Sequence, residues 1–102
     1  MEEQLKRKIQ EAIEEGKQIK ETVQDRDISE VFPYSTTILS LLERMAEELQ
    51  QPAPDGQRLL GLAGGLGRVV TDDYEFSESP LGSKLLEIVS EIVRRYDPRF
   101  QD

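Results

Sequence analysis

The chain has 102 residues, with 21 acidic and 13 basic side chains and a net charge of −8. This length corresponds to one domain and is too short for a catalytic barrel or a doubly wound sheet, and the acidic charge argues against a protein that binds nucleic acid through its phosphates. Cysteine and histidine are absent, which excludes disulfides, thiolate or imidazole catalysis, and metal centres built on those ligands.

Residues 1–24 have the hydrophobic periodicity of one long amphipathic helix. Their apolar and small residues recur at alternating spacings of four and three, as in a coiled-coil heptad repeat. This seam consists of Leu5, Ile9, Ala12, Gly16, Ile19 and Val23. It can be buried in either of two ways, by packing as the fourth member of a helical bundle or by pairing with a second copy of the chain. Its candidate contact residues in a homodimer are Leu5, Ile9, Ile19 and Val23.

A second helix is expected from Ser35 or Thr36 to about Gln51. The hydroxyl side chain of serine or threonine is a favourable N-cap for such a helix. The predicted buried stripe follows helical spacing and consists of Ile38, Leu41, Leu42, Met45 and Leu49. The prolines and glycine of residues 52–56 end this helix, and Asp55 is available to cap the next one.

Residues 57–70 are predicted to form a third helix of unusual composition. Residues 59–67 (LLGLAGGLG) include no charged or polar side chain, and a helix without a polar face is normally surrounded by protein. We therefore expect this helix to be the most enclosed one. The glycines match neither a phosphate-binding loop nor a dinucleotide-binding fingerprint, because the required lysine, hydroxyl and third glycine are missing. We interpret them as sites of close helix approach, or as a helix end and kink at Gly64-Gly65.

The segment 71–79 (TDDYEFSES) is predicted to be an acidic loop, and a hairpin that pairs 69–71 with 74–76 is the alternative. Its four acids are Asp72, Asp73, Glu75 and Glu78. Because carboxylate oxygens bind Ca²⁺ and Mg²⁺, these acids are weak candidate metal ligands, although the full pattern of a Ca²⁺-binding loop is absent. Tyr74 and Phe76 are candidate aromatic anchors for a protein contact.

The last helix is predicted to begin at Ser79-Pro80 and to run to about Tyr96. Serine is a favourable N-cap, and proline is preferred at the first helical position. The residues predicted to face the core are Leu81, Leu85, Ile88, Val89, Ile92 and Tyr96. Four amphipathic segments joined by short connections predict an all-α fold, a small up-and-down bundle of four helices.

The predicted single domain covers residues 1–102 and combines the long N-terminal helix (1–24) with a three-helix unit (35–96). No apolar run reaches the ~20 residues that cross a membrane, and the acidic first residues lack the apolar region of a signal peptide. We therefore expect a cytoplasmic protein that contacts neither membrane nor nucleic acid and holds no cofactor.

The absence of a complete catalytic motif favours a non-enzymatic function. Helical nucleotide pyrophosphatases bind Mg²⁺ through Glu-x-x-Glu and Glu-x-x-Asp pairs, but here no Glu is followed three residues later by Asp. We expect a small acidic module that acts through protein–protein contacts as a homodimer, and a more specific form of this hypothesis is an inhibitor of a basic partner. The alternative is a carboxylate-based metal binder or metal-dependent enzyme that uses the 72–78 loop.

Overall fold

The polypeptide is helical wherever its apolar residues follow helical spacing. The computed structural model describes residues 2–23 and 32–100. Its long helices are α1 (Glu2–Thr22), α3 (Ser35–Leu49), α4 (Gly56–Thr71) and α6 (Pro80–Tyr96). The five-residue helix α5 (Tyr74–Glu78) and the 3-10 turn η1 (Pro98–Phe100) complete the described elements. The predicted all-α bundle is therefore confirmed.

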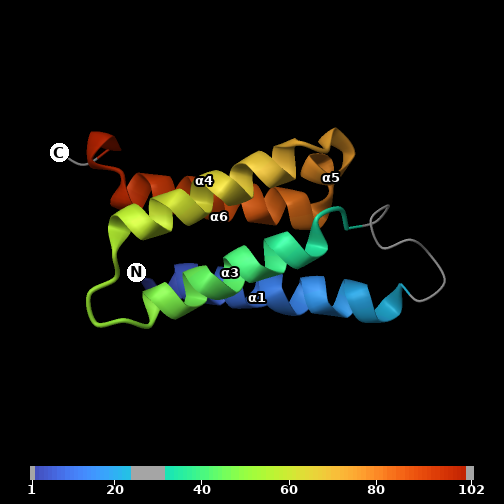
Figure 1. The fold of residues 1–102 in the computed structure, drawn as a ribbon, viewed down its shortest axis with the longest axis horizontal. Helices are drawn as coiled ribbons and strands as arrows, with labels where there is room; N and C mark the ends of the chain where they lie inside the picture. The colour runs from blue at the N-terminus through green and yellow to red at the C-terminus, as the bar shows by residue number, and fades with distance from the viewer. Residues whose placement is uncertain (1, 24–31, 101–102) are drawn as a thin grey trace.

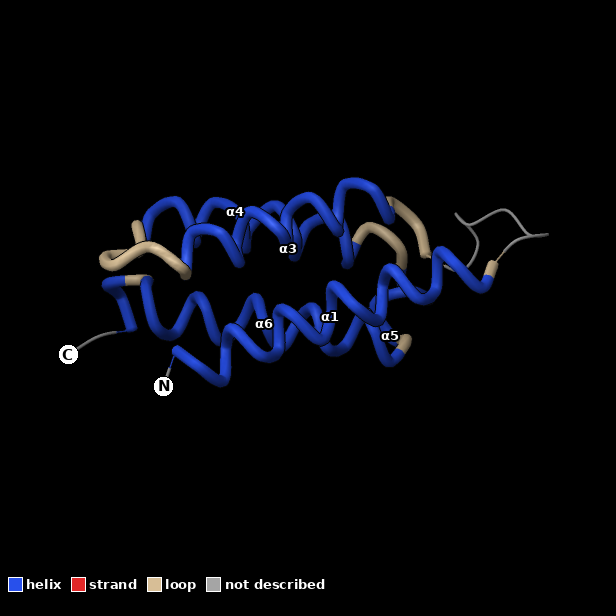
Figure 2. Tube along the Cα trace, turned by 90° about the horizontal axis from the view of Figure 1, so that it is seen from below, coloured by secondary structure: helices blue, strands red, loops and turns tan. Residues whose placement is uncertain are grey.

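The long helices run alternately up and down along a bundle that measures 48 × 25 × 18 Å (Figure 1). α1 packs against α3, α3 against α4 and α4 against α6, while α6 packs back against α1 and closes the ring. Figure 2 shows α3 and α4 in one layer and α1 and α6 in the other. α1 is thus the fourth member of the bundle, the first of the two roles expected for it.

The core runs along the bundle axis and receives apolar side chains from every long helix. Its largest fully buried side chains are Phe32, Leu5, Ile9, Ile38, Leu42, Met45, Leu49, Leu59, Leu66, Leu85, Ile88 and Ile92. One end of this core is closed by two aromatic rings, because Phe32 stacks on Phe76 of α5 with 5.5 Å between ring centroids. α5 is therefore fixed to the bundle through a buried side chain.

The contact between α1 and α3 involves a residue that the predicted stripe omitted. Leu39 is buried, whereas Leu41 is only half-buried. The reason lies at Gly16 of α1, where an added Cβ would be 2.9 Å from Leu39 Cδ2 and 3.0 Å from Phe32 Cε2. The missing side chain of Gly16 makes room for these two side chains, so the stripe of α3 is wider on the side that faces α1.

Two helix starts follow the predicted capping residues. Asp55 accepts hydrogen bonds from the backbone N–H groups of Gln57 and Arg58 at 3.0 and 3.3 Å. Ser79 accepts one from the N–H of Gly82 at 3.0 Å. Each side chain satisfies donors that a helix N-terminus leaves without partners, and both predictions are confirmed.

The prediction that Ser35 or Thr36 caps α3 is wrong. The residue before this helix is Tyr34, which has left-handed backbone (φ 57°) and provides no side-chain cap. Its carbonyl accepts a hydrogen bond from the N–H of Ile38 at 2.9 Å. Because the chain already turns at Tyr34, Ser35 becomes the first helical residue instead of the cap.

α4 continues through all of its glycines, so the second of the two interpretations, a helix end at Gly64-Gly65, is wrong. The expectation that this helix is the most enclosed one is also wrong. Apart from the chain neighbours and the backbone of the same helix, no described atom lies within 4 Å of the place where a Cβ of Gly61 or Gly64 would be, and both residues are exposed. Between residues 59 and 67, the outer face of α4 lacks polar groups because its exposed positions are glycines, and not because protein surrounds it.

The acidic segment forms neither the predicted loop nor the alternative hairpin. Residues 69–71 belong to α4, and residues 74–76 begin α5. Asp73 lies between the two helices and accepts a hydrogen bond from the N–H of Phe76 at 3.0 Å. Capping by Asp73 and burial of Phe76 favour a short helix here over an extended pair of strands.

Candidate functional site

Two tyrosines are the large apolar side chains that the described chain exposes most. Tyr74 is 75% exposed and Tyr34 is 50% exposed. Both belong to the same end of the bundle, where Tyr34 precedes α3 and Tyr74 begins α5 (Figure 1). Tyr34 Oη donates a hydrogen bond to Asp72 Oδ2 at 2.6 Å, and Asp72 directly follows α4. This bond ties the start of α3 to the turn that leads to Tyr74.

Acidic side chains surround these tyrosines. We call the whole surface the acidic tyrosine end, and it consists of Tyr34, Asp72, Asp73, Tyr74, Glu75 and Glu78. The hydrogen bond to Asp72 raises the pKa of the Tyr34 phenol above its ordinary value, and the negative charge of Asp72 acts in the same direction. Glu75 and Glu78 form no ion pair with any residue that the structure describes. Their charge is therefore available to a partner.

The four acids do not converge on one point. Asp72 accepts the Tyr34 hydroxyl, while Asp73 caps α5. Within the described residues, no group of three or more acidic side chains has an arrangement that could hold a metal ion. The geometry therefore gives no support to the alternative hypothesis of a metal site. Calorimetry with Mg²⁺, Mn²⁺ and Ca²⁺ tests that hypothesis directly.

The other predicted contact residues lie mostly inside the molecule. Leu5 and Ile9 are fully buried, because the seam of α1 faces α3 and α6 of its own chain. Ile19 and Val23 are half-buried toward the end of α1. Phe76 packs on Phe32 in the core. The seam thus provides packing within the chain, and Tyr74 is the predicted contact residue that the fold leaves widely accessible.

Tyr34 belongs to this surface and was not predicted from the sequence. The sequence reasoning for this region concerned only the helix expected from Ser35 or Thr36. The signal that could have identified it is the aromatic side chain itself, placed at a turn between two helical segments. Its proximity to Asp72, 38 residues away, depends on the tertiary fold.

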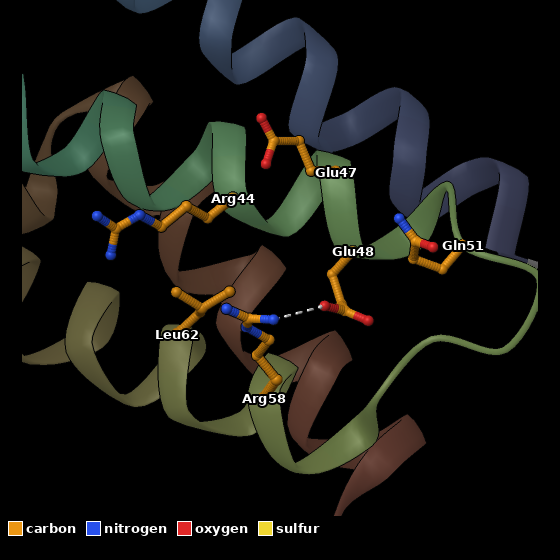
Figure 3. A pocket seen from close by; sticks show the side chains of 6 residues that line it. All are labelled: Arg44, Glu47, Glu48, Gln51, Arg58 and Leu62. Carbon is orange, nitrogen blue, oxygen red and sulfur yellow. Dashed lines mark ion pairs between the residues drawn. The ribbon is translucent and has the colours of Figure 1, made fainter.

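A hollow of about 520 Å³ lies between α3 and α4 (Figure 3). Its lining consists of Arg44, Glu47, Glu48, Gln51, Arg58 and Leu62. Glu48 stabilises the turn between the helices, because Oε2 accepts the N–H of Asp55 at 2.9 Å while Oε1 lies 3.7 Å from Arg58 Nη1. Arg44 points away from Arg58 in Figure 3. The two guanidinium groups therefore do not converge on a shared ligand position.

No family model, curated protein or solved structure matches the chain. In the described part of the chain, no helix combines the length and apolar character needed to cross a membrane. The functional interpretation therefore depends on the surface of the bundle, above all on the acidic tyrosine end.

Proposed function

We propose that this protein is a non-enzymatic binding module whose acidic tyrosine end contacts a basic surface of a partner protein. The observation that carries the proposal is Tyr74, 75% exposed beside acids that form no ion pair with described residues. Tyrosine is enriched in protein interfaces because one ring offers a large contact area and a hydroxyl group. Acidic neighbours attract a basic partner and accelerate association.

The rigidity of this end supports the same function. Tyr34 is held by its hydrogen bond to Asp72, and α5 is held by the stacking of Phe76 on Phe32. Anchors that are already in place lose less conformational entropy when a partner binds. In its specific form, the module is a cytoplasmic inhibitor that covers a basic site on its partner.

The partner can be identified by a photo-crosslinking residue at position 74 of the full chain in its native host. Binding of the purified partner is then measured by calorimetry at low and high salt. We expect Glu75→Gln/Glu78→Gln to weaken binding by about tenfold, which corresponds to ~1.4 kcal/mol, and we expect the loss to shrink at high salt. Tyr74→Ala is expected to weaken binding at both salt concentrations.

The matched control is Glu11→Gln/Glu14→Gln on the exposed face of α1. It removes the same number of charges at the same helical spacing, but away from the acidic tyrosine end. The proposal predicts that this control retains nearly full affinity. Equal losses in both pairs would show that only net charge matters, and an unaffected Tyr74→Ala variant would overturn the assigned surface.

A further inference from the structure

Tyr74 and Glu78 are the first and last residues of the short helix α5. Residues four apart in an α-helix lie one turn apart on the same face, so the aromatic ring and the carboxylate share one side of α5. Both residues are exposed. Glu75 directly follows Tyr74 and lies about 100° further round the helix axis, so its carboxylate belongs to another side.

The backbone that carries this pair is anchored at several points. Asp73 accepts a hydrogen bond from the N–H of Phe76 at 3.0 Å, and the Phe76 ring stacks on Phe32 in the core. The Tyr74 carbonyl oxygen accepts a hydrogen bond from the hydroxyl of Ser77 at 2.7 Å. The exposed ring and carboxylate are therefore presented by a helix that is already in place when a partner arrives, and this lowers the entropic cost of binding.

The pair offers two different contacts to one cationic side chain. The face of the Tyr74 ring attracts a cation, and the Glu78 carboxylate accepts N–H donors while forming no ion pair with a residue that the structure describes. A guanidinium group suits both contacts, because it is planar, stacks on aromatic rings and donates in a fork to a carboxylate. The ammonium group of lysine is compact and strongly hydrated, so it gains less from the ring.

We propose that this side of α5 recognises an arginine side chain of the partner protein, whose guanidinium stacks on Tyr74 and donates to Glu78. The inference rests on the function proposed above and adds the chemistry of the partner's contact residue. Asp72, Asp73 and Glu75 attract every cation alike, whereas the ring and the Glu78 carboxylate together distinguish arginine from lysine.

The basic residues that flank this surface in the sequence do not neutralise it. They are Arg68 on one side and Lys84 on the other. Lys84 is paired with Glu15 of α1, with 2.8 Å between Nζ and Oε2. Arg68 lies in the last turn of α4 and is one cation against the four acids of the acidic tyrosine end. The surface is therefore negative, and its charge favours a basic partner.

Two peptides separate arginine recognition from general attraction. Tetra-arginine amide and tetra-lysine amide carry the same charge, and their binding to the full chain is measured by NMR titration at physiological salt. We expect the arginine peptide to bind about threefold more tightly. Equal affinities would overturn the arginine inference but leave the proposed function in place, because charge alone would then explain the attraction. Failure of both peptides to bind would count against both.

Variants at three exposed positions assign the preference to the ring and the carboxylate. Tyr74→Leu should make the two dissociation constants equal, whereas Tyr74→Phe should keep the preference because its ring also stacks. Glu78→Gln and Glu75→Gln remove the same charge and form a matched pair. Glu78→Gln should reduce the preference for arginine, while Glu75→Gln should weaken both peptides by the same factor. A preference that persists in Tyr74→Leu, or equal effects of the two glutamine variants, would overturn the inference.

Discussion

Lys8 of α1 and Glu91 of α6 form an ion pair, with 3.0 Å between Nζ and Oε2, across the contact that closes the ring of helices. Glu91 is only 8% exposed, and its other oxygen lies 3.0 Å from Arg95 Nη2. Burial alone would raise the pKa of Glu91, but the hydrogen bonds from Lys8 and Arg95 outweigh burial and leave the pKa below its ordinary value. The α1–α6 contact therefore depends on charge as well as on apolar packing.

The variant Glu91→Gln should lower the free energy of unfolding by about 1–2 kcal/mol at neutral pH, because it removes the charge that both cations contact. The folded-state pKa of Glu91 lies below its ordinary value of 4.5. This contribution is therefore fully present above pH 4.5 and is lost as the pH falls through the lower, folded-state pKa.

Urea denaturation at neutral and acidic pH measures this difference. The gap between wild type and Glu91→Gln should narrow toward low pH, whereas a constant gap would contradict the role assigned to the charge. Asp97 also has a lowered pKa, because its carboxylate accepts hydrogen bonds from Arg99. Since Asp97 is present in both proteins, its contribution to the pH dependence cancels in the difference between their free energies of unfolding. The control Glu87→Gln removes a more exposed partner of Lys8 and should have a smaller effect.

Gly82 is the position at which a side chain is least tolerated. An added Cβ would collide with the Phe76 carbonyl group, lying 2.8 Å from its carbon and 3.0 Å from Ser77 Cα. These are backbone atoms of α5, so the neighbour cannot move aside by a rotamer change. We expect Gly82→Ala to destabilise the protein by about 2–3 kcal/mol, as measured by chemical denaturation.

The comparison for Gly82→Ala is Gly67→Ala, the same chemical change in a position where the added Cβ would make an ordinary contact with Val89. This variant should be neutral or stabilising by up to ~1 kcal/mol, since alanine favours the helix. Equal effects of the two substitutions would show that helix propensity, and not the collision with α5, determines stability at Gly82.

Helices were predictable where spacing and capping acted locally. Apolar periodicity located every long helix, and Asp55 and Ser79 cap the helices for which they were predicted. The left-handed turn at Tyr34 was not predictable in this way, because an aromatic residue in left-handed backbone has no strong local signature in the sequence. The exposure of the glycines of α4 was not predictable for another reason. Periodicity identifies which residues share a face, but not whether solvent or protein covers that face.

The candidate site was predictable only in part. Tyr74 was identified as a contact residue, whereas Phe76, two residues later, points into the core because Phe32 is there to stack on it. Neither that contact nor the bond between Tyr34 and Asp72 can be read from local sequence. Four acids that are close in sequence also suggested a metal site, but a turn and a short helix give them different roles.

Removing the Asp72 carboxylate should lower the pKa of Tyr34. In wild type this pKa is raised above its ordinary value of 10.0, chiefly by the hydrogen bond to Asp72. The raised pKa contributes stability that is fully present below pH 10 and is lost as the pH rises through the folded-state pKa, because the unfolded chain ionises first. Asp72→Asn should therefore lose less stability over the same alkaline range.

Phenolate absorbance measures this pKa in a Tyr74→Phe/Tyr96→Phe background, where Tyr34 is the remaining one of three tyrosines. Adding Asp72→Asn to this background should shift the titration of Tyr34 toward lower pH. The control is Glu78→Gln, which removes a carboxylate of the acidic tyrosine end that is not among the groups raising the pKa of Tyr34, and it should shift the titration much less. An identical titration with and without the Asp72 carboxylate would mean that the hydrogen bond does not hold Tyr34 in solution. That result would contradict the rigidity assigned to the acidic tyrosine end.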